Sequence, residues 1–162
     1  QTAEYFKNKF SLEDSIEEIM NDWNTMAYNY YTNDIKLKPG ALQYLLKLKE
    51  LGIKIGLATS NSMHLLTTTL KSNNAFELFD AITVTDEVEK SKSNPDIYLL
   101  AAKKLGVNPS ECMVFEDIIA AVYGAKLAGM KVTGVYDKHS EHQIDILKKE
   151  CDNYIYNYED LI

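Results

Sequence analysis

The chain has 162 residues, of which 46% are hydrophobic and 25% are charged, and its formal net charge is −7 at pH 7. This apolar content excludes a disordered chain, and the length is sufficient for a domain of ordinary size with its own core. Each of the 17 basic residues is a lysine, so the chain has no guanidinium group to bind a phosphate bidentately. Small molecules or proteins are therefore the expected partners, rather than nucleic acid or an anionic membrane.

The first 34 residues have the spacing of helices. From Leu12 to Tyr31, apolar residues recur along one stripe, which predicts a long amphipathic helix with Ser11 as its N-cap. Residues 32–38 break this pattern and are expected to be a linker. Residues 1–34 are therefore expected to form part of a separate, smaller helical unit.

From residue 39 onward, short apolar runs alternate with helical patterns. Strands are expected at residues 53–57, 81–84, 112–115, 131–135 and 154–156. Helices are expected from Pro39 to Gly52, at 62–72, from Pro95 to Gly106, at 117–128 and near 141–149. Repeated strand–helix units of this length require parallel strands with right-handed crossovers. The predicted fold class is therefore α/β, a Rossmann-like parallel sheet with helices on both faces.

In an open parallel sheet, ligands bind beyond the carboxyl ends of the strands, so the polar residues there are the candidates for a site. Thr59, Ser60 and Asn61 follow the first predicted strand and precede a helix. Hydroxyl groups and the amides of a helix start suit a phosphate or another oxyanion. The alternative is that Ser60 or Asn61 only caps the helix.

Two further groups follow later strands. Lys92 lies just ahead of the Pro95 helix, in a loop that is either solvated or holds its ammonium group over the same edge. Glu116 and Asp117 stand where the third strand ends, and adjacent carboxylates there suit Mg²⁺. The alternative is that Asp117 caps the next helix while Glu116 points to water. The hydroxyl groups, the lysine and the acidic pair follow three successive strands, and together they indicate a single site.

Several runs of this sequence resemble the motifs of one enzyme family. They are GLATSN at residues 56–61, SKSNPDIY at 91–98, VFED at 114–117 and AKLAGM at 125–130. By their order and spacing the chain resembles the haloacid dehalogenase-like superfamily, and within it the β-phosphoglucomutase-like phosphatase branch. The similarity extends over essentially the whole chain. It implies that residues 1–34 are part of a helical cap and that residues 35–162 are the α/β core without its first strand.

The resemblance implies Mg²⁺-dependent phosphoryl transfer through an aspartyl-phosphate. Thr59 matches the hydroxyl that binds the transferring phosphoryl group, with Ser60 and Asn61 beside it. Lys92 matches the lysine that neutralises the charge of phosphate and nucleophile. The Mg²⁺-holding acids of the family are matched by Glu116 and Asp117. Thr59 and Lys92 are thus the expected catalytic residues.

The sequence departs from the family pattern in three places. Ser93 and Asn94 replace Pro-Ala after Lys92, which is expected to make this loop less rigid, and Ile118 stands where a serine is common. The family's nucleophile lies in an Asp-x-Asp motif on the first strand, and these 162 residues contain no such motif. We therefore expect a C-terminal portion of a protein of about 215 residues, the usual family size. Without that strand, the strands ending at Leu57 and Phe115 would lack a partner.

The expected function is hydrolysis of a small, sugar-type phosphomonoester by the full-length protein. The alternatives are mutase action on a hexose 1-phosphate or, for this chain alone, a catalytically inactive fragment or binding module. We expect the protein to be a monomer. Cys112 and Cys151 stand in no metal or redox spacing, and Cys112 opens an apolar run, where a buried reduced thiol is expected. Because the sequence shows no signal or transit peptide, a cytoplasmic location is expected.

Overall fold

Short parallel strands form the sheet in the computed structural model, which describes residues 2–162. Strand β1 (Gly56–Thr59) pairs with β2 (Ala81–Val84). Strand β3 (Met113–Glu116) pairs with β4 (Lys131–Val135), which also pairs with β5 (Asn153–Ile155). Every one of these pairings is parallel, as the alternation of strands and helices predicts.

The sheet falls into two pieces. Within residues 2–162, β1 has a strand neighbour only in β2, and β3 only in β4. These are the two strands expected to lack a partner. The pieces nevertheless share one core, because Ala58 of β1 and Val114 of β3 pack against the same buried cluster, which includes Ile97, Val122 and Val132.

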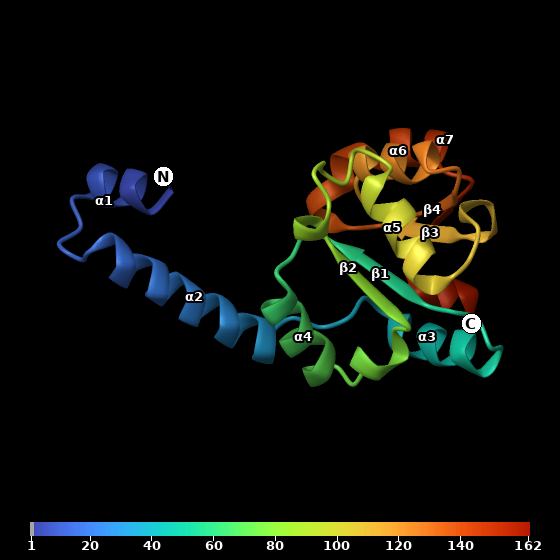
Figure 1. Ribbon diagram of the computed structural model, residues 1–162, viewed down its shortest axis with the longest axis horizontal. Helices are drawn as coiled ribbons and strands as arrows, with labels where there is room; N and C mark the ends of the chain where they lie inside the picture. The colour runs from blue at the N-terminus through green and yellow to red at the C-terminus, as the bar shows by residue number, and fades with distance from the viewer. Residues whose placement is uncertain (1) are drawn as a thin grey trace.

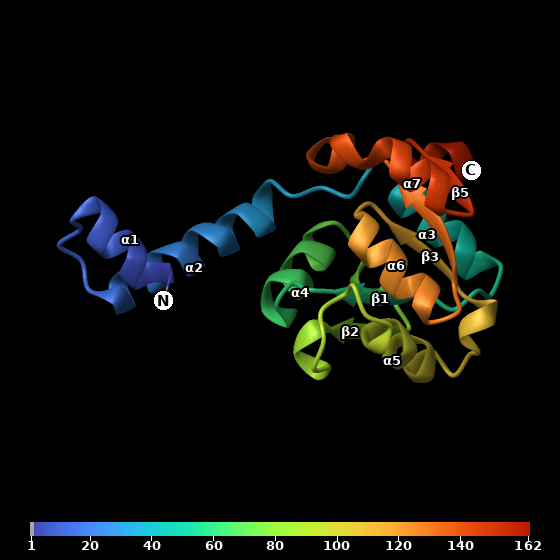
Figure 2. The same cartoon turned by 90° about the horizontal axis from the view of Figure 1, so that it is seen from above.

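Helices cover both faces of the sheet, as predicted (Figures 1 and 2). Helices α3 (Ala41–Glu50) and α4 (Met63–Ser72) lie on one side. On the other side lie α5 (Asp96–Leu105), α6 (Ile119–Leu127) and α7 (Ile144–Glu150). Among the described residues, no helix is long and apolar enough to cross a membrane. Short 3₁₀ turns complete the chain at Phe76–Leu78, Thr85–Glu87, Pro109–Glu111, Lys138–Gln143 and Tyr158–Leu161.

Two helices run out from the sheet, α1 (Thr2–Phe10) and α2 (Ile16–Asn33) (Figure 1). The prediction that Ser11 caps the long helix is wrong. The N-cap is Ser15, whose hydroxyl accepts a hydrogen bond from the Glu18 amide at 3.2 Å, while the Glu18 carboxylate accepts one from the Ser15 amide at 2.8 Å. This reciprocal capping box satisfies two free amides, whereas Ser11 lies in a turn with a φ of +50°.

Several predicted boundaries also shift. The strand predicted at 53–57 is observed at Gly56–Thr59, and Ile53 is 46% exposed. Asp80 accounts for the late start. Its carboxylate accepts the Ile55 amide hydrogen at 2.7 Å, and the pairing of β1 with β2 begins at the next residue, Gly56. Pro39 precedes its helix instead of starting it, since Gly40 is the N-cap. Strand β3 begins and ends one residue later than predicted, β5 lies one residue earlier, and α6 starts two residues later.

Residues 34–40, here called the connector, join α2 to α3. Helix α4 fastens the first part of the connector and the end of α2. The Thr69 hydroxyl donates to the Tyr31 carbonyl at 3.0 Å, and the Asn73 side chain donates to the Ile35 carbonyl at 2.9 Å and accepts the Leu37 amide hydrogen at 3.4 Å. Side chains of one helix therefore fix the path of the backbone that leaves another.

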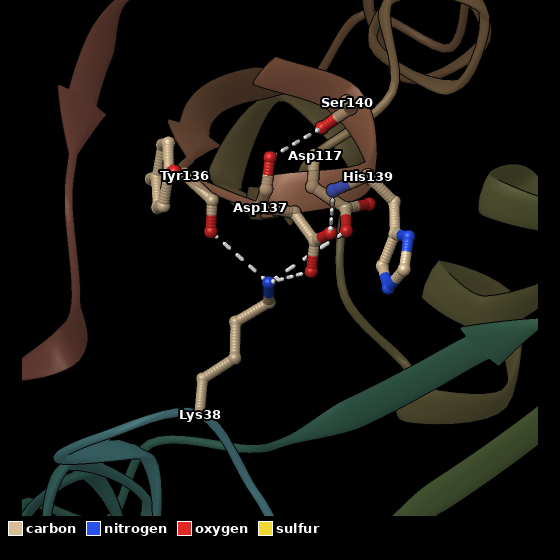
Figure 3. A network of polar contacts seen from close by, with 6 residues as sticks. All are labelled: Lys38, Asp117, Tyr136, Asp137, His139 and Ser140. Carbon is tan, nitrogen blue, oxygen red and sulfur yellow. Dashed lines mark hydrogen bonds and ion pairs between the residues drawn. The ribbon is translucent and has the colours of Figure 1, made fainter.

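Lys38 fastens the second part of the connector (Figure 3). Its ammonium group donates to the Tyr136 carbonyl at 3.0 Å and to Oδ2 of Asp137 at 2.5 Å. The other carboxylate oxygen of Asp137 accepts the His139 amide hydrogen at 2.8 Å. The hydrogen bond from Lys38 holds the pKa of Asp137 below its ordinary value, and burial opposes this shift only in part. The connector is thus tied to the loop that follows β4.

This ion pair makes stability depend on pH in a defined direction. Because the pKa of Asp137 is lower in the folded than in the unfolded state, its carboxylate stabilises the fold above the unfolded pKa of about 4. That contribution is lost as the pH falls through the folded pKa. Lys38→Met should therefore raise the pKa of Asp137 in an NMR titration and lower the free energy of unfolding at neutral pH. The difference in stability from the wild type should narrow in acid.

Lys131→Met is the matched control, because Lys131 is an exposed lysine on β4 and its loss changes the net charge equally. Equal pKa values for Asp137 in the two variants would show that Lys38 does not hold this carboxylate.

Candidate functional site

The first candidate group lies in the turn between β1 and α4. Thr59 is the last residue of β1, and its hydroxyl accepts the Asn61 amide hydrogen at 3.1 Å. The Asn61 side chain accepts the Ser62 amide hydrogen at 2.9 Å. Ser62 is the N-cap of α4, accepting from the Leu65 amide at 3.4 Å. The alternative that Ser60 or Asn61 caps this helix is therefore wrong, and the exposed Ser60 is free of that task.

Lys92 lies in a tight loop ahead of α5. The Asn94 amide donates to the Ser91 carbonyl at 2.9 Å, and the hydroxyls of Ser91 and Ser93 are 2.8 Å apart. These polar contacts stand where the family has Pro-Ala, at Ser93 and Asn94. Gly124 of α6 packs directly on the loop, since a Cβ atom there would clash with the backbone oxygens of Lys92 and Asn94. The position of Lys92 is thus fixed by the close approach of a helix backbone.

Glu116 is a buried carboxylate at the carboxyl end of β3. It is 8% exposed, so the alternative that it points to water is wrong. Its Oε1 atom lies 2.5 Å from Nζ of Lys92. The hydroxyl of Tyr98, which is 2% exposed, donates to the same oxygen at 2.9 Å. The structure therefore brings Lys92 and Glu116 together and adds a tyrosine.

Asp117 follows β3 and keeps 32% of its side chain exposed. Its Oδ2 atom lies 3.8 Å from Nζ of Lys38, so this lysine faces both Asp117 and Asp137 (Figure 3). The alternative that Asp117 caps α6 is wrong. The Ile119 amide at the helix start donates instead to the Gln143 side chain at 2.9 Å, so the Asp117 carboxylate faces Lys38 and caps no helix.

The acidic pair also changes the titration of nearby tyrosines. Burial raises the pKa of the Tyr98 hydroxyl above its ordinary value, and the charge and hydrogen bond of Glu116 raise it further. Burial likewise raises the pKa of Tyr158, with smaller contributions from Asp117 and Glu116. Tyr98 is therefore protonated throughout the neutral range and acts as a permanent hydrogen-bond donor to Glu116.

Tyr98 and Lys38 are the polar residues of this region to which the sequence assigns no role. Tyr98 lies in the third position of α5, within an apolar stripe, and a phenol at such a position is a signal that a buried acceptor is near. Lys38 carries no local signal, because its acceptors follow β4, far along the chain.

The candidate residues form two groups, one in the turn after β1 and one where the loop ahead of α5 meets the end of β3. Within residues 2–162, no hydrogen bond or ion pair joins residues 59–61 to Lys92, Glu116 or Asp117. Residues 2–162 also contain no cluster of three or more His, Cys, Asp or Glu side chains that could hold a metal ion. Mg²⁺ is, however, commonly held by one or two carboxylates together with water and substrate phosphate. The oxygen-only donor set of Glu116 and Asp117 therefore fits this ion.

Comparison with known proteins assigns the chain to a family. Residues 1–135 match the family model described as haloacid dehalogenase-like hydrolase. The chain is 47% identical to "Putative phosphatase YhcW" of Bacillus subtilis over 103 residues, which are 64% of this chain and 47% of that protein. It is 34% identical to hexitol phosphatase B of Escherichia coli over 95 residues, which are 59% of this chain and 43% of that protein.

A solved structure resembles the fold over almost its full extent. The crystal structure titled "putative beta-phosphoglucomutase" from Thermotoga maritima superposes with a TM-score of 0.81 and 27% identity, covering 96% of this chain and 72% of that one. The chain spans about half the length of the curated relatives it matches. On the family model, the curated relatives and this structural likeness, the chain belongs to the haloacid dehalogenase-like hydrolases, in their phosphatase branch.

Proposed function

We propose that the whole protein hydrolyses a small, sugar-type phosphomonoester. The observation that carries this proposal is the contact of 2.5 Å between Nζ of Lys92 and Oε1 of Glu116 at the carboxyl end of β3, with the partly exposed carboxylate of Asp117 as the next residue. Family membership and relatives named as phosphatases support the same reaction class.

The roles of the site residues follow from the needs of phosphoryl transfer, which are positioning and charge neutralisation. Lys92 balances the negative charge of the phosphoryl group, and Thr59 donates a hydrogen bond to one of its oxygens. Ser60 and Asn61 complete the phosphate-binding turn. Glu116 and Asp117 would hold Mg²⁺, which when bound supplies further positive charge to the phosphoryl oxygens.

The nucleophile of the proposed reaction is an aspartate outside these 162 residues, because they contain no Asp-x-Asp motif. The one-sided pairing of β1 and of β3 supports the proposal that the strand carrying it belongs between them. In this scheme, residues 35–162 are the rest of the α/β core, and residues 1–34 are part of a helical cap over the substrate. The proposed setting is the cytoplasm, with the protein acting as a monomer.

Isomerisation of a hexose 1-phosphate is the second candidate function. The likeness to a structure titled as a β-phosphoglucomutase favours it. The two functions differ in their products, because a hydrolase releases inorganic phosphate whereas a mutase returns a sugar phosphate. Incubation of the whole protein with a hexose 1-phosphate, followed by measurement of both products, decides between them. Release of inorganic phosphate alone is the expected result.

Loss of either charged group of the site should slow the reaction. In the whole protein, Lys92→Met and Asp117→Asn should each lower kcat about 100-fold or more, as the loss of one transition-state contact does in other enzymes. Turnover of an aryl phosphate in the presence of Mg²⁺ measures this effect. Lys90→Met, which removes a more exposed lysine of the same loop, is the control and should keep the rate of the wild type. Nearly normal rates in both site variants would contradict the assignment.

The isolated 162-residue chain should bind phosphate analogues weakly and turn over no aryl phosphate, because it lacks the proposed nucleophile.

The whole protein should lose its activity when Mg²⁺ is removed with a chelator and regain it when Mg²⁺ is restored. An intact mass of 18.4 kDa for the native protein, together with turnover, would disprove the proposed origin of the nucleophile.

A further inference from the structure

We propose that Tyr98 is a positioning residue of the site. In this view its hydroxyl determines which oxygen of Glu116 faces Lys92 and keeps the other oxygen available to a cation. The inference rests on the proposed function, since it assumes that Glu116 is a ligand of Mg²⁺.

The geometry concentrates two donors on one atom. Nζ of Lys92 and the Tyr98 hydroxyl both contact Oε1 of Glu116, at 2.5 and 2.9 Å. No hydrogen bond to Oε2 of Glu116 occurs among residues 2–162. A carboxylate bound at one oxygen from two directions has a fixed orientation, so its second oxygen also has a fixed position.

Tyr98 can impose this orientation because its ring cannot move. The ring is 2% exposed and belongs to the main core cluster, together with Ile97, Val122 and Ala125. Its hydroxyl therefore approaches Glu116 from a single direction. Rigid support of this kind is the property that a positioning group needs.

The same ring also meets Lys92. The ammonium group of Lys92 lies 5.9 Å from the ring centroid. A Cβ atom added to Gly124 would lie 2.9 Å from Cε2 of Tyr98 and would clash with the backbone oxygen of Lys92. Helix α6 therefore packs against both Tyr98 and Lys92 at Gly124, whose lack of a side chain allows the close approach.

The test is the substitution Tyr98→Phe, which keeps the ring and removes only the hydroxyl. The matched control is Tyr154→Phe, because the hydroxyl of Tyr154 is also buried but has no hydrogen-bond partner among the described residues. Both variants lose a buried oxygen atom, and only Tyr98→Phe loses a contact with Glu116.

In the whole protein, Tyr98→Phe should weaken Mg²⁺ binding in calorimetry about 10- to 100-fold, the usual effect of losing a group that orients a metal ligand. Its kcat should fall with little change in KM for an aryl phosphate. Tyr154→Phe should leave the Mg²⁺ affinity and kcat as in the wild type. If the wild type is active and binds Mg²⁺ but the two variants behave alike, the role of Tyr98 is overturned and the proposed function stays intact.

A second measurement needs neither metal nor substrate. Unfolding by urea of Tyr98→Phe, Glu116→Ala and the double variant gives the coupling between the two side chains. Non-additive effects are expected, because the single variants break the same hydrogen bond. Additive effects would overturn the inference. A wild type without Mg²⁺ binding or turnover would instead disprove the proposed function and, with it, the role of Tyr98 in presenting a metal ligand.

Discussion

The buried carboxylate of Glu116 is the constraint on which the site depends. A charge that is 8% exposed destabilises a fold unless it meets a partner, and its partners here are an ammonium group and a phenol. To supply them, the loop ahead of α5 must lie against the end of β3. Gly124 makes that approach possible, because α6 has no side chain at the point of contact. The packing of three elements is thus coupled to the electrostatic needs of one residue.

Helix capping determines which polar groups are free at the carboxyl edge. Every helix begins with amides that need acceptors, and candidate site residues are often used for that purpose. Here the start of α4 is served by Ser62, and the first amide of α6 by Gln143. Ser60 and Asp117, which stand near the starts of these helices, therefore do not cap them. The carboxylate of Asp117 therefore caps no helix and stays partly exposed, facing Lys38.

Local signals explain what could be predicted from the sequence. The bounds of β2 and β4 and the stop of α5 at Gly106 match the prediction, because alternating apolar runs and a left-handed glycine act over a few residues. The candidate groups at the strand ends follow from the same alternation. The predicted boundaries near Ser11 and Ile53 are wrong because other residues take the expected role. Ser15 caps the helix in place of Ser11, since Glu18 is placed to complete its capping box. The Asp80 carboxylate accepts the Ile55 amide hydrogen ahead of the first residue of β1. Tyr98 and Lys38 act on partners brought close only by the tertiary fold, which no spacing in the sequence reveals.

The division of the sheet has a consequence for how the site is assembled. Each parallel pair joins strands that are separated by one crossover, so each can close without waiting for the other piece. The two pieces then meet through α5 and α6, where Ala58 and Val114 enter the same cluster. In the whole protein, the strand proposed to lie between β1 and β3 would enter the sheet at this boundary. The pair of Lys92 and Glu116 spans the boundary between α5 and β3, so the site forms only when assembly is complete.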